Sequence, residues 1–339
     1  MAGSICPMDT PPCKRLLVVK LSSLGDLFHA LPAVHNLKVK LGVLVDWVVQ
    51  EEYADLVRCF SDVEAVIPFR RHDALRGLPR FLRALRAREY DLVIDLQGLL
   101  KSAWIARAAR GGRRLGPSFA REGAALLYSA VAGVRNKTRH AVEENLDAVR
   151  YLGLDLMPAE FPVRFPERSL DTRRPRVGLA PFSRWRTKNW SADNYAATGR
   201  RLRTEAGATV HLFGAGAEAA VCRSIAAAIG PAVVDHGGRT TLVETGSLLA
   251  GMDLVIANDS GLMHMAAAAG VPVLAVFGAT DPRRTGPYGR GHEVLQAELA
   301  CCPCLQRVCR LSTLECLERI TPEAVTAKAL AMLGRRSWV

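Results

Sequence analysis

The stretch that begins at Asp253 limits the possible folds more than any other part of the chain, because it encodes a strand, a helix and a second strand joined by very short loops. The three elements are expected over residues 254–257, 262–269 and 273–277. Asp259 and Ser260 are both suitable caps for the helix. The free N–H groups at Ser260 and Gly261 predict a phosphate site, although a well-capped helix in any doubly wound sheet explains the same pattern.

The alternation of strand and helix continues in two sets, separated by a stretch rich in proline and arginine at 161–176, which we interpret as a linker. Expected strands are 16–20, 43–49, 63–68, 90–95, 177–182, 210–213 and 232–235, and expected helices are 27–40, 78–88, 191–204, 219–228, 242–249 and 322–333. The pattern predicts an α/β protein with two Rossmann-like, doubly wound domains, residues 14–165 and 175–320, and a last helix within 321–335. Because ligands gather at the carboxyl ends of strands in such sheets, we expect a central cleft between the domains.

The composition is that of a globular protein, with 339 residues, 49% hydrophobic and 23% charged. Polar residues interrupt the longest apolar window, near Val255, which argues against a membrane span, and no apolar signal core precedes Lys14. We therefore expect a cytoplasmic protein. The net charge of +12 favours an anionic partner, which could be nucleic acid, anionic lipid or a phosphorylated sugar, and a solvated basic surface is the alternative.

Five of the nine cysteines lie close together near the C-terminus. Their C-x-x-C pair is not accompanied by a second pair or by histidines, so no familiar zinc pattern is complete. A disulfide framework is not expected in the cytosol. We expect a reduced cluster that stabilises a loop, with a bound metal as the alternative. The cluster comprises Cys301, Cys302, Cys304, Cys309 and Cys316.

Asp26 lies where the first expected strand gives way to the first expected helix. Such an elbow is where Rossmann-like sheets place their ligands, so its carboxylate is a candidate for chemistry. A carboxylate at a helix start is also a common cap, and that structural role is the alternative.

Several motifs, in order and at compatible spacing, resemble those of the ADP-heptose:lipopolysaccharide heptosyltransferases, which are inverting glycosyltransferases of the two-Rossmann GT-B architecture. The motifs are K-L-S-S-L-G-D at 20–26, Y-D-L-V-I-D-L-Q-G at 90–98, A-R-E at 120–122, H-A-V-E at 140–143, K-N-W at 188–190, N-D-S-G-L-M-H at 258–264 and Y-G at 288–289. The first-half motifs are more similar to heptosyltransferase I, which adds the first heptose to Kdo on lipid A, than to type II.

The resemblance implies roles for the matching positions. Asp26 would be the general base that deprotonates the acceptor hydroxyl. Lys188 would neutralise the donor diphosphate, which the helix N-terminus at Ser260 and Gly261 would hold while Asp259 fixes the loop. Because these groups can replace a metal, no obligatory divalent cation is expected. Further donor contacts are expected from Ser183, Thr187, Glu218 and His264, although the loop at 180–188 lacks the paired threonines of type I enzymes, and a packed helix residue is the alternative for His264.

The acceptor would bind the N-terminal half. Kdo carboxylates and lipid A phosphates are anionic, which suits guanidinium and ammonium groups. The expected contacts are Arg70, Arg71, Lys101, Arg121 and His140. The resemblance therefore implies ADP-heptose and Kdo-lipid A as partners, no nucleic acid, and a peripheral position at the cytosolic face of the anionic inner membrane.

Other functions remain open. A transferase of the same family could act on a later core heptose, as heptosyltransferase II does, or could use another nucleotide sugar. A basic nucleic-acid-binding protein with a cysteine-rich metal module is an alternative from another class. A non-catalytic relative that serves as a binding module is a third, and the joint presence of Asp26 and Lys188 argues against it.

Overall fold

The computed structural model describes residues 13–70, 74–170, 175–231 and 233–335, and the side chains of 74–76 are also outside the description. The chain divides into two compact units that are continuous in sequence, with the division between Arg164 and Phe165. The predicted first domain ended at residue 165. Each unit has its own sheet and its own core.

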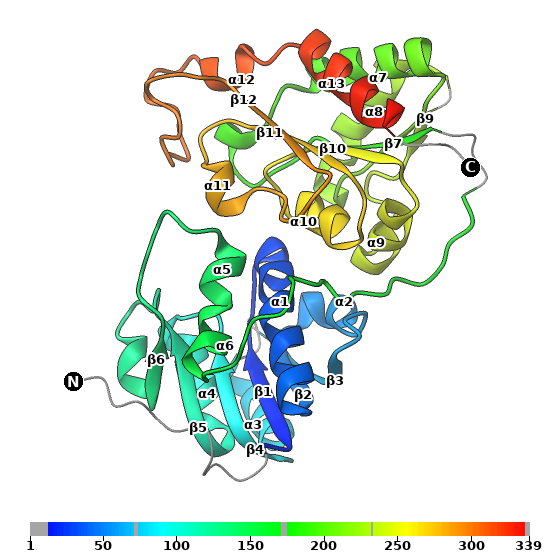
Figure 1. Ribbon diagram of the computed structural model, residues 1–339. Coiled ribbons are helices and arrows are strands. Elements are labelled where there is room, and N and C mark those ends of the chain that lie inside the picture. The colour runs from blue at the N-terminus through cyan, green and yellow to red at the C-terminus, as the bar shows by residue number, and fades with distance from the viewer. Residues whose placement is uncertain (1–12, 71–73, 171–174, 232, 336–339) are drawn as a thin grey trace. The chain divides into compact units, whose positions relative to one another are not determined.

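Unit 1 is built on a parallel six-stranded sheet in the order β3-β2-β1-β4-β5-β6 (Figure 1). The strands are β1 Arg15–Val19, β2 Leu44–Gln50, β3 Val63–Phe69, β4 Glu89–Asp95, β5 Arg110–Pro117 and β6 Ala130–Ala132. The chain runs outward from β1 in one direction and then returns to β4 on its other side. The loops that follow β1 and β4 therefore meet at the topological switch point, where open α/β sheets bind their ligands.

Helices cover both faces of this sheet because its strands alternate buried side chains between the two faces. The helices are α1 Leu24–Leu41, α2 Ala54–Val57, α3 Ala74–Leu85, α4 Leu100–Ala108, α5 Ala141–Asn145 and α6 Asp147–Tyr151, with short 3₁₀ turns η1 Glu51–Tyr53 and η2 Ala124–Leu127. On one face, Phe81 of α3 and Ile105 of α4 share a core with Leu17 of β1. On the other, Phe28 of α1 packs edge-on against Phe60, and α1 contacts α5 and α6.

Unit 2 repeats the design in the order β12-β11-β10-β7-β8-β9, again with every pairing parallel. Its strands are β7 Arg176–Ala180, β8 Thr209–Leu212, β9 Val233–Asp235, β10 Leu254–Asn258, β11 Val273–Phe277 and β12 Glu293–Gln296. The switch point lies between β7 and β10. The two loops that follow these strands therefore lie side by side.

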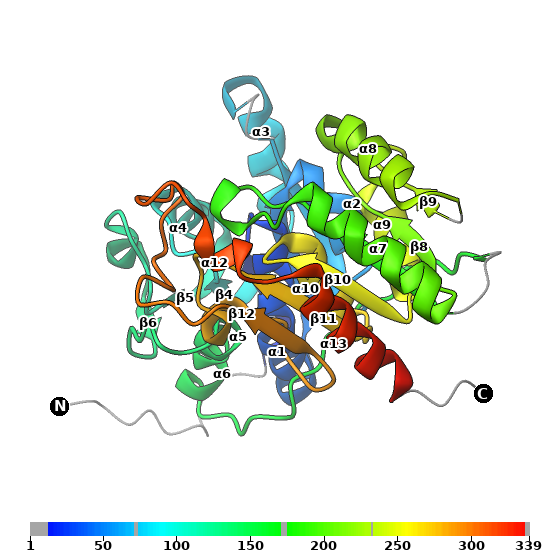
Figure 2. The ribbon, with the colours of Figure 1, turned by 90° about the horizontal axis from the view of Figure 1, so that it is seen from above.

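The helices of unit 2 also cover both faces of its sheet. They are α7 Ala192–Ala206, α8 Ala219–Ile229, α9 Leu242–Ala250, α10 Gly261–Ala268, α11 Pro282–Thr285, α12 Glu315–Glu318 and α13 Pro322–Gly334, with η3 Arg186–Lys188 and η4 Gly216–Glu218. Figure 2 shows α7 between α8 and α13, and all three pack on one core. The helices α9 and α10 contact each other on the opposite face (Figure 1). The last helix thus belongs to unit 2.

The predicted strand–helix–strand unit is present, as β10, α10 and β11. Ser191 and Thr321 cap α7 and α13, because the side chain of each accepts an N–H group of its helix. The prediction for α1 was wrong at its start, because the helix begins at Leu24, so that Asp26 lies within its first turn. Among the described helices, none has the length and apolar content needed to cross a bilayer.

Candidate active site

Asp26 is held at the switch point of unit 1, in the first turn of α1. Its Oδ2 accepts hydrogen bonds from the Ser23 N–H and the Ser23 hydroxyl, each at 2.9 Å. Its side chain is nevertheless 44% exposed. The carboxylate therefore accepts hydrogen bonds at the start of α1 and is also accessible to a ligand. A structural role at the helix start and a role in chemistry are thus compatible for Asp26.

Charge around Asp26 keeps it ionised. Burial alone raises its pKa, but the nearby His29 ring, the Lys20 ammonium and the Ser23 amide together hold the pKa well below the usual carboxyl range. Lys20 is buried and donates to the Leu96 carbonyl oxygen at 2.6 Å. Burial lowers the pKa of Lys20, whereas Asp26 opposes that shift.

Two histidines adjoin this carboxylate. The Nδ1 of His29 lies 3.7 Å from Oδ1 of Asp26, and the His29 ring meets the His140 ring edge-on at 5.4 Å. His140 caps α5 by accepting the Val142 N–H at its Nδ1, so its Nε2 carries the proton when the ring is neutral. The structure thus brings His140, predicted from sequence, close to Asp26 through His29, which was not predicted.

The other predicted acceptor contacts lie on loops or helix ends of unit 1. Arg70 is exposed and pairs with Glu51 at 2.7 Å, and Lys101 lies 5.4 Å above the ring of Phe69, next to Arg70 in sequence. Arg121 is exposed, and its main-chain N–H donates to the Gly98 carbonyl oxygen at 2.8 Å. Arg71 lies outside the described residues.

In unit 2, the loops that follow β7 and β11 both contact Asp259, which lies directly after β10. Its Oδ2 forms an ion pair with Lys188 Nζ at 2.6 Å and accepts from the Thr280 hydroxyl at 2.7 Å. The Ser183 hydroxyl donates to its carbonyl oxygen at 2.8 Å. Lys188 also lies 4.7 Å from the centre of the Trp185 ring. Lys188, Asp259 and Ser183, all predicted from sequence, therefore form one cluster.

The start of α10 lies beside this cluster. Ser260 occupies the N-cap position but makes no side-chain cap bond, and its buried hydroxyl has no hydrogen-bond partner among the described residues. The first N–H groups of α10, beginning at Gly261, are thus not capped by Ser260, which suits an anion. His264 is buried one turn further on. Glu218 lies in η4, after β8, and accepts the Ala215 N–H at 2.7 Å.

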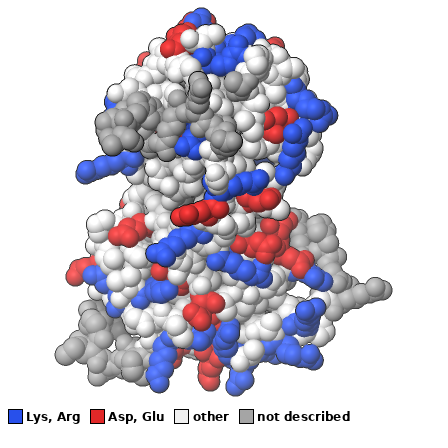
Figure 3. Space-filling view, turned by 90° about the vertical axis from the view of Figure 1, so that its right-hand side faces the viewer, with Lys and Arg blue, Asp and Glu red and all other residues white. Residues whose placement is uncertain are grey.

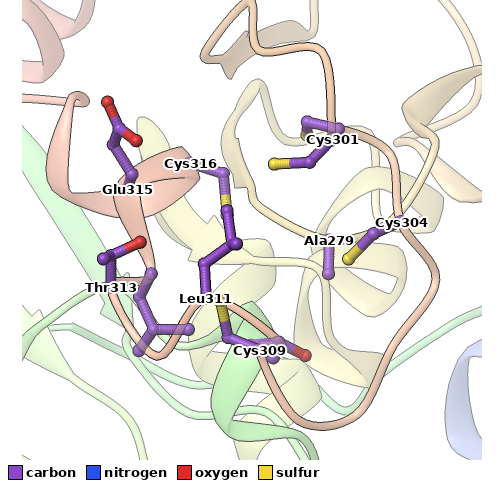
Figure 4. A pocket seen from close by; sticks show the side chains of 11 residues that line it. Ala279, Cys301, Cys304, Cys309, Leu311, Thr313, Glu315 and Cys316 are labelled. Carbon is purple, nitrogen blue, oxygen red and sulfur yellow. The ribbon is translucent and has the colours of Figure 1, made fainter.

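The loop that carries Lys188 rests on the cysteine-rich segment. Thr187 is buried and donates its hydroxyl to the Gln306 carbonyl oxygen at 2.7 Å, while Arg307 stacks over Trp185. The described cysteines carry free thiols. All five of the segment line one small cavity of about 30 Å³ that also touches Thr187 (Figure 4).

The thiols of this segment differ in their chemistry. Backbone N–H groups of residues 311–314 lower the pKa of Cys309, whereas burial raises the pKa of Cys302 to about 11. Within the described ranges, no three His, Cys, Asp or Glu side chains are grouped closely enough to hold a metal ion.

Comparison with known proteins assigns the chain to a protein family. Residues 78–315 match the model of glycosyltransferase family 9 (heptosyltransferase). The chain belongs to this family. It is 32% identical to lipopolysaccharide heptosyltransferase 1 of Pseudomonas aeruginosa, an alignment that covers 94% of this chain and 98% of the relative. It is 27% identical to lipooligosaccharide heptosyltransferase 2 of Haemophilus influenzae over 80% of this chain and 86% of the relative.

This family 9 glycosyltransferase also matches solved structures. The structure described as E. coli heptosyltransferase WaaC with ADP superposes with a TM-score of 0.78 at 27% identity, covering 94% of this chain and 99% of that one. Both six-stranded parallel sheets match the GT-B architecture of that enzyme, which confirms the predicted fold class. The chain is therefore an enzyme that transfers a sugar.

Several polar residues of the site were not singled out from the sequence, among them His29, Gln97 and Asn258. His29 lies one helical turn after Asp26, and a D-x-x-H spacing on a helix was the available signal. Gln97 and Asn258 each stand at the carboxyl end of a buried strand, where a polar side chain is a signal for a ligand loop. Both tie neighbouring loops together.

Proposed function

We propose that this glycosyltransferase moves L-glycero-D-manno-heptose from ADP-heptose to a Kdo residue of lipid A, in the biosynthesis of the lipopolysaccharide inner core. The observation that carries the proposal is the similarity to a heptosyltransferase 1 over 94% of the chain, because it includes the segments around both Asp26 and Lys188. The heptosyltransferase 2 relative is less similar and is matched over a smaller share of the chain, which favours the type I reaction.

In the proposed mechanism, the acceptor hydroxyl oxygen attacks the anomeric carbon as the bond from that carbon to the ADP oxygen breaks. The leaving ADP takes the bonding electrons, and the configuration inverts. Asp26 takes the hydroxyl proton. Because its pKa is held low, Asp26 is a weak base, and the proton moves only once the attacking oxygen has become acidic through bond formation.

The groups around Asp259 suit the donor diphosphate. Lys188 supplies a positive charge, and the start of α10 at Ser260 and Gly261 supplies N–H groups along the positive end of a helix dipole. Asp259 holds Lys188 in place through their ion pair, and the Thr280 hydroxyl in turn holds Asp259. These groups can stabilise the charge that develops on ADP without a divalent cation, so we propose that no metal is required.

The decisive assay measures heptose transfer from ADP-heptose to Kdo-lipid A, in the presence of EDTA, at equal concentrations of folded protein. We expect the wild type to be active and Asp26→Ala to be about 10²-fold slower or worse, because the proton acceptor is lost. Asp26→Asn keeps the size of the side chain and serves as the isosteric control. Full activity of either variant would exclude Asp26 as the base, and dependence of the wild type on added Mg²⁺ would exclude the metal-free mechanism.

We further propose that the enzyme works as a peripheral protein at an anionic membrane, where a lipid-anchored acceptor resides. On the face shown in Figure 3, Lys and Arg side chains are spread over both units and interspersed with Asp and Glu. We therefore expect modest binding to vesicles that contain anionic lipid, little binding to zwitterionic vesicles, and loss of binding as salt is raised. Cosedimentation tests this, and equal binding to both kinds of vesicle would contradict it.

A further inference from the structure

The loop that carries Asp26 is fastened to the neighbouring loop by one side chain, that of Gln97. Gln97 is the second residue after β4, and its Oε1 accepts the main-chain N–H groups of both Leu21 and Ser22, each at 3.0 Å. These two residues lie between β1 and the start of α1. The contact therefore spans the switch point of unit 1, directly before the turn that presents Asp26.

The orientation of the Gln97 amide follows from its partners. Two N–H donors converge on one atom, and only the oxygen of a carboxamide can accept both. Rotating the amide would set its NH₂ group against two donors. Leu21 is also fixed on its other side, because its carbonyl oxygen accepts the Gln50 N–H from the end of β2 at 3.1 Å. The loop is thus clamped from both neighbouring strands.

Gln97 is itself held firmly. Its N–H and that of Gly98 donate to Oδ1 of Asp95, at 2.7 and 3.1 Å, and the Tyr128 hydroxyl donates to Oδ2 of Asp95 at 2.6 Å. Asp95 is fully buried. The carbonyl oxygen of Gly98 in turn accepts the Arg121 N–H. One short segment after β4 therefore joins the Asp26 loop to the backbone of a predicted acceptor contact.

In unit 2, a carboxamide side chain also joins the two loops at the switch point. Asn258, the last residue of β10, donates from Nδ2 to the Pro181 carbonyl oxygen at 2.6 Å, and its Oδ1 accepts from the Trp190 N–H at 3.2 Å. A carboxamide at the end of one central strand thus anchors the loop that follows the other central strand in both units. The two strands, β4 and β10, occupy equivalent places in their sheets, although Gln97 lies two residues beyond the end of β4 whereas Asn258 is the last residue of β10.

We propose that Gln97 is a positioning residue that sets the placement of Asp26 for proton transfer, an inference that rests on the proposed role of Asp26 as the base. Gln97 acts through the main chain of Leu21 and Ser22. Loss of its oxygen leaves two N–H groups without their acceptor and lets the loop shift. A displacement of about 1 Å at a reacting group can cost about 10²-fold in rate.

The test compares Gln97→Met, which keeps the length but removes the acceptor, with Gln97→Glu, which keeps an oxygen at the same reach. At equal folded concentration we expect Gln97→Met to lower kcat about 10- to 100-fold, with the KM for ADP-heptose unchanged, and Gln97→Glu to keep most of kcat. On an Asp26→Ala background, Gln97→Met should lower the residual rate no further, because no base remains to be placed.

A matched control separates positioning from general stability. Asn36 on α1 is another buried carboxamide of unit 1, which accepts the Met157 N–H at 2.7 Å and donates to the Pro32 carbonyl oxygen at 2.8 Å. We expect Asn36→Leu to lower the melting temperature and to leave kcat unchanged. Hydrogen exchange should be faster at the amides of Leu21 and Ser22 in Gln97→Met, but not in Asn36→Leu.

The outcomes distinguish this inference from the proposed function. If the wild type is active and Asp26→Ala is not, an unchanged kcat for Gln97→Met would overturn the positioning role. An equal loss of rate on the Asp26→Ala background would overturn it as well. If the wild type transfers no heptose although the Leu21 and Ser22 amides are protected through Gln97, the proposed function fails while the contact itself stands.

Discussion

Lys188 illustrates how a single charge depends on its neighbours. Its ammonium lies against Asp259 at 2.6 Å and over the Trp185 ring, and its side chain is only 17% exposed. Little water surrounds this ammonium group even before a ligand binds. Water therefore screens its attraction to an anion only weakly. This is a favourable arrangement for binding a diphosphate.

We expect Lys188→Met to weaken ADP binding about tenfold to hundredfold, the usual range for a lost charge-assisted hydrogen bond. Isothermal titration calorimetry measures the change. Arg201→Met is the matched control, because it removes one positive charge from an exposed ion pair on α7 of the same unit. ADP affinity equal to that of the wild type in Lys188→Met would remove Lys188 from the donor site.

At the scale of elements, β8 and β9 are joined by a histidine pair. Nδ1 of His211, on β8, lies 3.0 Å from Nε2 of His236, which directly follows β9, and the rings stack at 5.3 Å. Burial, together with the positive charges of His236 and Arg176, lowers the pKa of His211 from 6.5 to about 4. The pair is therefore stable while His211 is neutral.

This pair predicts an acid-sensitive contribution to folding. Because the folded pKa of His211 lies below the unfolded value, the unfolded chain binds more protons between pH 6.5 and 4, and the free energy of unfolding falls as the pH falls through that range. Protonation of the His211 ring lowers the free energy of unfolding by an amount on the order of 3 kcal/mol across this range. Urea unfolding across this range should show a steeper loss for the wild type than for His211→Gln, and parallel curves would contradict the prediction.

The elements differ in how well the sequence predicts them. Strands such as β10 and β11 are continuous apolar runs and could be located closely. In contrast, β5 has the sequence R-G-G-R-R-L-G-P and gave no strand signal. Its glycines are needed for packing, because a Cβ at Gly111 would lie 2.2 Å from the Tyr90 carbonyl oxygen and one at Gly112 would lie 1.8 Å from that of Asp91.

The site shows the same difference. Asp26 and the Ser260–Gly261 turn lie at strand ends, and single-residue rules could find them. The contact from Gln97 to Leu21 joins residues far apart in sequence, and the link from Thr187 to Gln306 likewise depends on the fold. Residue type and local spacing do not indicate which distant residues will be in contact. These two hydrogen bonds could therefore be identified only from the structure.

At the scale of the whole molecule, the chain is two similar units in succession. Each has a parallel sheet of six strands with helices on both faces and a carboxamide at its switch point. The proposed acceptor contacts all belong to unit 1, and the proposed donor contacts all belong to unit 2. The two halves of the proposed reaction are thus assigned to separate cores.

The division between Arg164 and Phe165 has a genetic consequence, because the chain passes from one unit to the other only once. A single recombination event between related genes at that junction exchanges a whole sheet with its helices and breaks no strand pairing within either half. Under the proposed assignment of acceptor contacts to unit 1 and donor contacts to unit 2, such an exchange would join the acceptor preference of one gene to the donor preference of another.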